Sequence, residues 1–291
     1  MPSIKEYNSK INSLKNTSKI TKTMKMVSAS KLRKAQDSQR KAKDFAHEVN
    51  QLIRRIAGTV DENLHPLLKP HEKTERVLLV IYSSDKGLCG GFNNNLIRHV
   101  ERYLEERAGD GIHYELAFCG RRGYVHFQSR AVIHKHFDLV SANPSAHDAS
   151  RVMRHLEKVY LDGTFDQILL MVNEFISPLA QIPRVQQLLP LTAQDLPEEA
   201  LEAPPPVSDI ISEPGMESLL SFLVPRLVSF KVFYALLENA AGEHGARMTA
   251  MDNATTNAQN LIEENTLLRN RARQAAITTE LIEIISGAEA L

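Results

Sequence analysis

The two ends of the chain are long stretches without a helix breaker. Neither Gly nor Pro occurs from Ser3 to Ala57, and neither occurs from Ala246 to Ser286. At about 1.5 Å per residue, these stretches would form helices of roughly 80 Å and roughly 60 Å. A single compact domain of this chain length would be only about 40–50 Å across. Helices this long therefore have to protrude, and a protruding rod usually reaches into a partner.

Apolar spacing indicates that the two end helices pair with each other. In the first helix, Ile4, Tyr7, Ile11 and Leu14 follow a 3-4-3 stripe. The stripe resumes out of phase at Ile20, Met24 and Val27, so we expect the neighbouring surface to change along the helix. A chain that runs into a central domain and out again makes such a pair antiparallel. The second helix holds strict 4-3 spacing over Ala254, Ala258, Leu261, Asn265, Leu268, Ala272, Ala275, Thr279, Ile282 and Ser286.

The region between the end helices alternates between strand and helix patterns. Short apolar runs separated by helical stretches predict an α/β fold with a mostly parallel, Rossmann-like sheet. Residues 192–217 hold seven acidic residues, five prolines and no basic residue, which predicts an acidic flexible connection. The predicted organisation is a coiled-coil helix over 1–60, a central domain over 74–192, the connection over 193–215 and a second coiled-coil helix over 216–291. Expected strands lie at 77–82, 115–119, 131–137, 167–174 and 184–191, and expected helices at 93–107 and 146–161.

Charge is balanced over the whole chain but segregated along it. Lys plus Arg and Asp plus Glu each number 35, whereas residues 1–57 hold 14 basic and four acidic residues, a surplus of ten. Such a surplus suits the phosphates of a nucleic acid, and it suits an acidic protein collar around the helix equally well. The chain has no Trp, and aromatic residues that could stack on bases are sparse in the first helix. Composition alone leaves both interpretations open.

The remaining bulk features favour a soluble protein of a reducing compartment. Two cysteines, Cys89 and Cys119, do not make a disulfide framework. No apolar run approaches the ~18–20 residues of a membrane span. The first residues lack the apolar core of a signal peptide, and Glu6 is unlike a transit peptide. We therefore expect a cytosolic chain that reaches a membrane only through a partner.

Two short motifs have a chemical interpretation and a structural one. The turn Asp85–Gly91 follows a strand and precedes a helix, as phosphate loops do, but it matches neither common phosphate-binding glycine pattern. Glycines at positive φ explain the turn, and nothing nearby in sequence supplies a base that would make Cys89 a nucleophile. His134 and His136 would share one face of a strand, as a metal pair would, but no third ligand follows at a telling spacing. A tight turn and a solvated sheet face are predicted, with no cofactor, metal or catalytic residue.

Four stretches resemble the gamma subunit of F-type ATP synthases. Ile11–Lys34 (INSLKNTSKITKTMKMVSASKLRK) resembles the opening of that family, and Ser84–Asn93 (SDKGLCGGFN) resembles its central motif. Glu243–Thr255 (EHGARMTAMDNAT) and Ala272–Ala290 (ARQAAITTELIEIISGAEA) resemble two blocks of its C-terminal helix. These motifs fall at both ends and in the middle, in family order, so the likeness covers the whole chain.

The resemblance implies a role that composition does not show. In this family the antiparallel coiled coil is a shaft inside a hexamer of three alpha and three beta chains. The α/β part sits at the foot, against the epsilon chain and the membrane ring of c subunits. Ion flow turns the ring and the shaft, and the shaft changes the nucleotide affinity of each beta site in turn. The chain would thus be a non-catalytic subunit with no nucleic-acid partner, and the basic first helix would complement the collar.

The resemblance also implies a location and a set of coupling residues. No cysteine-bearing insertion interrupts the middle and no mitochondrial presequence is seen, so we expect a bacterial subunit bound peripherally at the cytoplasmic side of the inner membrane. A shaft biases a site only by contacting its conformations differently, so polar residues that face beta are the candidates. By motif match the beta-contact residues are Arg247, Arg273, Gln274, Thr278 and Glu280, with Met24, Lys25 and Met26 near the same region on the opposite helix.

Overall fold

The computed structural model describes residues 3–57, 65–138, 140–191 and 216–289 of the 291-residue chain. They form two compact units: a helical unit, Met1–Ser28 with Arg247–Leu291, and a sheet unit, Ala29–Ala246. The boundary divides both long helices, α1 (Ile4–Ala57) and α5 (Met216–Glu289). The predicted acidic connection at 193–215 lies outside the described residues.

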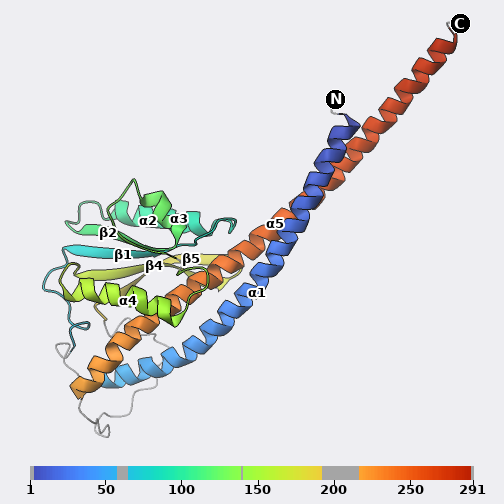
Figure 1. The fold of residues 1–291 in the computed structure, drawn as a ribbon. Helices are drawn as coiled ribbons and strands as arrows, with labels where there is room; N and C mark the ends of the chain where they lie inside the picture. Colours follow the sequence, from blue (N-terminus) through green and yellow to red (C-terminus); the bar gives the residue numbers. More distant parts are fainter. Residues whose placement is uncertain (1–2, 58–64, 139, 192–215, 290–291) are drawn as a thin grey trace. The chain divides into compact units, whose positions relative to one another are not determined.

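The sheet unit is built on a five-stranded sheet with the order β3-β2-β1-β4-β5 (Figure 1). β1 (Arg76–Tyr82), β2 (His113–Cys119), β3 (Ile133–Phe137) and β4 (Gln167–Ser177) are parallel, whereas β5 (Ala180–Leu189) is antiparallel to β4. Only two residues join β4 to β5, too few for the crossover that a parallel pair needs. The mostly parallel α/β sheet expected from the sequence is confirmed.

Helices cover both faces of this sheet. α2 (Phe92–Glu106) and α3 (Arg121–Phe127) pack on one face, and α4 (Ala146–Leu161) and the first part of α5 pack on the other (Figure 1). Alternate side chains of β1 therefore enter two separate cores, which explains why the strand reads as an unbroken apolar run. The sequence did not indicate α3, because seven residues are too few to display a helical repeat.

A bulge in β3 separates the two histidines that the sequence placed on one face. The pairing of β2 with β3 shifts register between Leu116 and Ala117, opposite His134. His134 Nε2 lies 3.0 Å from His155 Nε2 of α4. The His136 ring instead stacks on Tyr124 of α3, with centroids 4.3 Å apart. The expected shared, solvated face is wrong, because one extra residue in a strand reverses the side chains that follow it.

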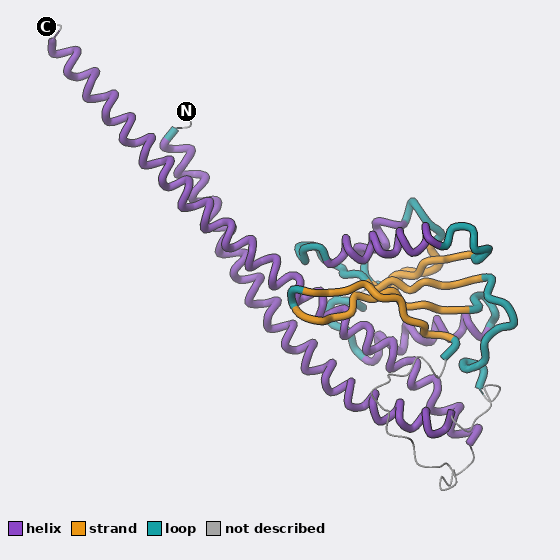
Figure 2. Tube along the Cα trace, turned by 180° about the vertical axis from the view of Figure 1, so that it is seen from behind, coloured by secondary structure: helices purple, strands orange, loops and turns teal. Residues whose placement is uncertain are grey.

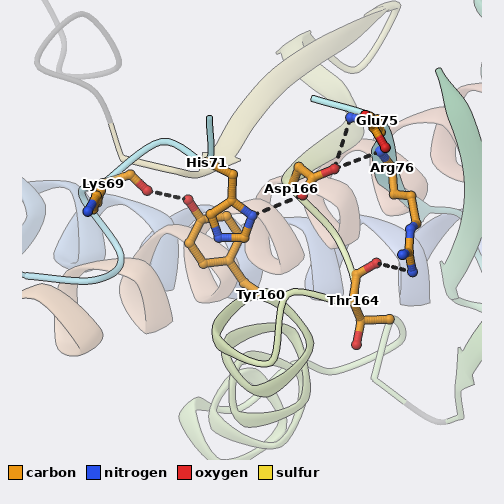
Figure 3. A network of polar contacts seen from close by, with 7 residues as sticks. All are labelled: Lys69, His71, Glu75, Arg76, Tyr160, Thr164 and Asp166. Atoms are coloured by element: carbon orange, nitrogen blue, oxygen red, sulfur yellow. Dashed lines mark hydrogen bonds and ion pairs between the residues drawn. The ribbon is translucent and has the colours of Figure 1, made fainter. Parts of the chain in front are cut away.

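A polar network fastens the segment before β1 to the start of β4 (Figure 3). Asp166 accepts hydrogen bonds from the backbone N–H groups of Glu75 and Arg76, at 2.9 and 2.8 Å. Its other oxygen lies 3.0 Å from His71 Nδ1, and the His71 ring stacks on Tyr160. Burial acts against the ionised carboxyl, but these hydrogen bonds outweigh it and lower the pKa of Asp166. One carboxylate thus fixes the entry of the chain into the sheet.

In the helical unit, the parts of α1 and α5 run antiparallel and side by side (Figures 1 and 2). Their buried residues follow the 3-4 spacing of a two-helix seam. This pairing confirms the coiled coil expected from the apolar spacing, and Ala258, Asn265 and Ala272 of the expected α5 stripe are buried or half-buried in it. Among the buried or half-buried positions of this unit, a regular 3-4 spacing joins 4, 7, 11, 14, 18, 21, 25 and 28 of α1 and 251, 255, 258, 262, 265, 269 and 272 of α5. Met24, Ala254 and Leu268 are half-buried beside these positions.

The seam of α1 keeps its phase, contrary to the slip expected from the sequence. Thr21 and Ser28 are buried in it, whereas Ile20 and Val27 are 61% and 51% exposed. The expectation was wrong because it counted apolar residues only, and a short hydroxyl side chain also packs in a seam when it is hydrogen-bonded. On α5 the seam position also differs by one residue from the expected one: Leu261 is exposed, and Ile262 lies in the seam.

Candidate partner-contact surface

Three polar contacts fix how the two helices of the helical unit align. The Thr21 and Thr255 hydroxyl oxygens lie 2.7 Å apart, and the Lys25 ammonium lies 2.6 Å from the Asp252 carboxylate. Near the start of α1, Arg269 donates to the side-chain oxygen of Asn8 at 3.4 Å. Each step forward on α1 is matched by a step back on α5. The same register brings Ile4, the first residue of α1, level with Arg273.

Beyond Arg273, α5 continues as a single helix, and we call residues 274–289 the tip (Figures 1 and 2). Five large apolar side chains of the tip are about half or more exposed: Ile277 49%, Leu281 54%, Ile282 58%, Ile284 67% and Ile285 58%. A cluster of exposed apolar residues on a helix marks an interaction surface, because leaving it in water is unfavourable. The expected seam residues Ala275, Thr279, Ile282 and Ser286 are likewise exposed.

The apolar side chains of the tip gather on one side of the helix. Ile277, Leu281 and Ile284 stand at i, i+4 and i+7, which is one stripe of an α-helix. Arg273 and Glu280, seven residues apart, lie on a common face next to this stripe, and both are exposed. The tip therefore differs from side to side, with an apolar stripe flanked by charge.

Four of the predicted coupling residues are brought together at or next to the tip. Arg273, Gln274, Thr278 and Glu280 are all exposed. The Thr278 hydroxyl donates to the Gln274 carbonyl of its own helix at 2.9 Å. These side chains fall within about two helical turns, but Thr278 and Glu280, two residues apart, point to different sides of the helix.

The other predicted coupling residues lie elsewhere in the helical unit. Met26 is 58% exposed, Met24 is half-buried, and Lys25 forms the ion pair with Asp252. Arg247 is only 8% exposed. It stands 26 residues before Arg273 on α5, a separation of about 40 Å along a helix. The eight residues therefore form two groups rather than one site.

Sequence reasoning missed part of this surface. Ile20 and Val27 were assigned to the seam but are exposed beside Met26, and the apolar residues of the tip were not singled out. Counting Ser and Thr as seam residues would have restored the regular 3-4 spacing and left these side chains outside it. On α1 they share the surface with exposed lysines at positions 5, 10, 15, 19 and 22, so the surface is both apolar and basic.

The glycine-rich turn after β1 is held by buried side chains. The Asn93 side chain accepts from the Ser84 backbone N–H at 3.0 Å and donates to the Ser84 hydroxyl at 2.7 Å. It also donates to the Cys89 sulfur at 3.2 Å, and Cys89 is 2% exposed and packs against Phe92. The Cys89 thiol is thus held within the turn by burial and by this hydrogen bond.

Among the described residues, no helix is both long enough and apolar enough to cross a membrane. Nor do three or more His, Cys, Asp or Glu side chains gather among these residues in a group that could hold a metal ion.

Comparison with known proteins gives one consistent result. A family model described as ATP synthase matches residues 3–291. An ATP synthase gamma chain from Trichlorobacter lovleyi is 42% identical over 291 residues, covering all of this chain and 99% of the relative. One from Anaeromyxobacter sp. (strain Fw109-5) is 45% identical over 300 residues, covering both chains in full. A chain in the central stalk and c-ring structure of the Tetrahymena thermophila mitochondrial ATP synthase matches with a TM-score of 0.60 and 25% identity, covering 81% of this chain and 99% of that one.

Proposed function

The chain belongs to the ATP synthase gamma family, and on this premise we propose that it is the central rotor shaft of an F-type ATP synthase. The tip of α5 is the observation that carries the proposal, because its apolar side chains extend past the start of α1. A single helix with such a surface needs a surrounding partner in water. A collar of alpha and beta chains would supply that partner.

The proposed partners divide between the two units. The alpha and beta chains surround the helical unit, and the exposed lysines of α1 complement acidic groups of that collar. The sheet unit contacts the epsilon chain and the ring of c subunits. The chain is then held at the cytoplasmic side of the bacterial inner membrane through these partners.

In this role the chain performs no chemistry of its own. It changes the affinity of each beta site by contacting the conformations of beta unequally. The side-to-side difference of the tip suits this task, since rotation presents the apolar stripe and then the charged face to each beta chain in turn. We propose that Arg273, Gln274, Thr278 and Glu280 make the polar part of these contacts. Met24, Lys25, Met26 and Arg247 form a second contact further along the helical unit.

The test is reconstitution of the full chain with alpha and beta chains. The chain alone should hydrolyse no ATP, and turnover should appear with the complex. Gln274→Ala and Thr278→Ala together should lower coupled turnover several-fold without preventing assembly. Gln259→Ala, an equally exposed glutamine of α5 outside the tip, is the matched control and should behave as the wild type. ATP hydrolysis unchanged in the double-variant complex would contradict the assignment of these residues.

The alternative of a nucleic-acid-binding protein gains no support from the fold or from the relatives. Its own test is duplex binding, which should fall steeply with salt if only phosphate contacts contribute. A gel shift that persists at physiological ionic strength would restore this alternative.

A further inference from the structure

A groove of about 550 Å³ lies in the sheet unit, between the turn after β1 and the helices α2 and α3. The turn contributes residues 87–90 to the lining, and α2 contributes Ile97. α3 contributes Arg122, and Arg130 follows shortly after α3. This volume falls within the range of small-molecule sites, about 300–1,000 Å³. None of the proposed coupling residues lines it.

The lining of the groove is basic. It includes Arg122, Arg130 and His126, and none of the described residues that line it is acidic. Arg130 and His126 share the carboxylate of Glu101 behind them, at 3.6 and 2.8 Å. Within the described part of the chain, Arg122 has no such ion pair. Among the described residues, the groove therefore holds one guanidinium without an ion pair, beside a second that shares a carboxylate with His126.

The position of Arg122 is fixed by the turn itself. Its backbone N–H donates to the Ser84 carbonyl at 3.0 Å, and the preceding N–H of Arg121 donates to the Asp85 carboxylate at 3.2 Å. The guanidinium lies directly over Gly87, where an added Cβ would come within 2.5 Å of Nη2. Because Gly87 has no side chain, the positive charge can lie against the backbone of the turn.

The backbone of the turn also suits an anion. Leu88 and Gly90 have φ of 62° and 57°, and Gly91 follows with φ of −80°. Alternation between left-handed and right-handed residues turns successive N–H groups toward one side, which makes an anion-binding concavity. The Leu88 side chain is 63% exposed, so its left-handed conformation does not serve to bury it. The conformation instead shapes the edge of the groove.

We propose that this groove binds a phosphate group, carried by an organic phosphate of about nucleotide size. Arg122 supplies the charge and a planar fork of donors that can contact two phosphate oxygens at once. Ile97 and Val125 provide an apolar wall for the organic part of the ligand. This site is separate from the contacts of a shaft with its collar, and it would give the Asp85–Gly91 turn a binding role as well as a structural one.

The test is isothermal titration of ADP, and separately of inorganic pyrophosphate, into the purified full chain. We expect single-site binding of ADP, weakened at least about tenfold in Arg122→Gln, because charge-assisted hydrogen bonds are lost. Arg102→Gln is the matched control, since Arg102 is an exposed arginine of α2 that does not line the groove. Circular dichroism spectra and melting temperatures should be the same for all three proteins.

A second arm distinguishes a soluble ligand from a lipid headgroup. Co-sedimentation with phosphatidylglycerol–phosphatidylcholine vesicles that depends on Arg122, without ADP binding, would identify a lipid phosphate as the source. Equal losses in Arg122→Gln and Arg102→Gln would overturn the proposal in favour of diffuse charge attraction. Absence of binding to every probe at millimolar concentration would overturn it as well.

Discussion

The hydroxyl oxygens of Thr21 and Thr255 lie 2.7 Å apart in the seam between α1 and α5. Each hydroxyl also has a carbonyl of its own helix within reach, that of Ser18 for Thr21 and that of Met251 for Thr255. One hydroxyl can therefore donate across the seam while the other donates to its own helix. The pair lets two polar residues occupy positions where an apolar seam would carry leucine or isoleucine.

This pair should stabilise the helical unit cooperatively. Thr21→Val or Thr255→Val alone should cost about 1 kcal/mol, because each leaves one buried hydroxyl without its partner. The double variant should cost less than the sum, because both polar groups are then gone. Amide hydrogen exchange in residues 4–28 and 247–273 would measure this, 1 kcal/mol being roughly a fivefold change in protection. Strict additivity would contradict the coupling.

The exposed ion pair nearby provides a contrast. Lys25→Ala should lower the stability of the helical unit by about 0–1 kcal/mol, because both side chains are well exposed to solvent. The loss should shrink further at 1 M salt, where charges are screened. A salt-independent loss larger than that of Thr255→Val in the same exchange experiment would show that Lys25 acts by packing and not by charge.

Replacement of Asp166 should lower the stability of the sheet unit, because Asp166 holds the backbone at the start of β1. Asp166→Asn puts an amide in place of an oxygen that accepts from backbone N–H groups, and should cost about 1–3 kcal/mol at neutral pH. Because the fold lowers the pKa of Asp166 below its ordinary 3.8, its contribution is full above that value and is lost as pH falls further. Thermal melting between pH 7 and pH 2.5 should show less acid sensitivity in the variant. Equal acid sensitivity would contradict this role.

Glu238 should make the sheet unit less stable as pH rises toward neutral. Its carboxyl on α5 is buried and accepts from the Phe175 backbone N–H at 3.3 Å. Burial raises the pKa of Glu238 from 4.5 to about 7, partly opposed by that hydrogen bond and reinforced by Glu174. The neutral form therefore favours the fold, and its contribution is present below 4.5 and lost as pH rises through 7.

Glu238→Gln should remove this dependence. At pH 8 the variant should be more stable than the wild type by up to about 3 kcal/mol, and near pH 4.5 the two should be similar. Urea unfolding followed across that range would measure the difference. Glu105→Gln, at an exposed carboxylate of α2, is the control and should leave the profile unchanged. A variant with the wild-type pH profile would place the titration elsewhere.

Two glycines with positive φ should respond very differently to alanine. At Gly120, with φ of 105°, a Cβ would overlap the Ser83 carbonyl oxygen, whereas at Gly163, with φ of 66°, no atom lies within 4 Å. Gly163→Ala should cost about 1–2 kcal/mol for the left-handed backbone alone. Gly120→Ala should cost several kcal/mol more, since the turn between β2 and α3 has to move. Melting temperatures would test this, and similar losses in the two variants would contradict it.

The parts of the fold that follow from local patterns were predictable. All five strands appear near their expected positions. The pattern is clearest for β1, because a strand buried on both faces needs a continuous apolar run. The bulge at His134 was not predictable, since register depends on β2 and not on β3 alone. The phase of α1 was misread for a different reason: Thr21 looks like a surface residue until its partner Thr255 is known.

The proposed contact residues rest on the resemblance and not on local sequence patterns. Gln274 and Thr278 were identified by motif, and composition would not have separated them from other polar residues of α5. Ile277 and Leu281 could not be recognised as exposed, because exposure at the tip depends on where α1 begins relative to α5. That alignment is set by contacts such as Asn8 with Arg269, between residues far apart in sequence.

The tip has a consequence for how the chain is ordered before and after assembly. The end of a helix that packs against no neighbour is only marginally stable in water, because most helical stability in proteins comes from tertiary packing. Residues 274–289 lack the α1 neighbour that supports the rest of the seam. In the free chain they should fray and re-form, and enclosure by a partner should complete the helix. Part of the binding free energy would then be spent on ordering the last turns, so that affinity for the partner and helicity of the tip rise and fall together.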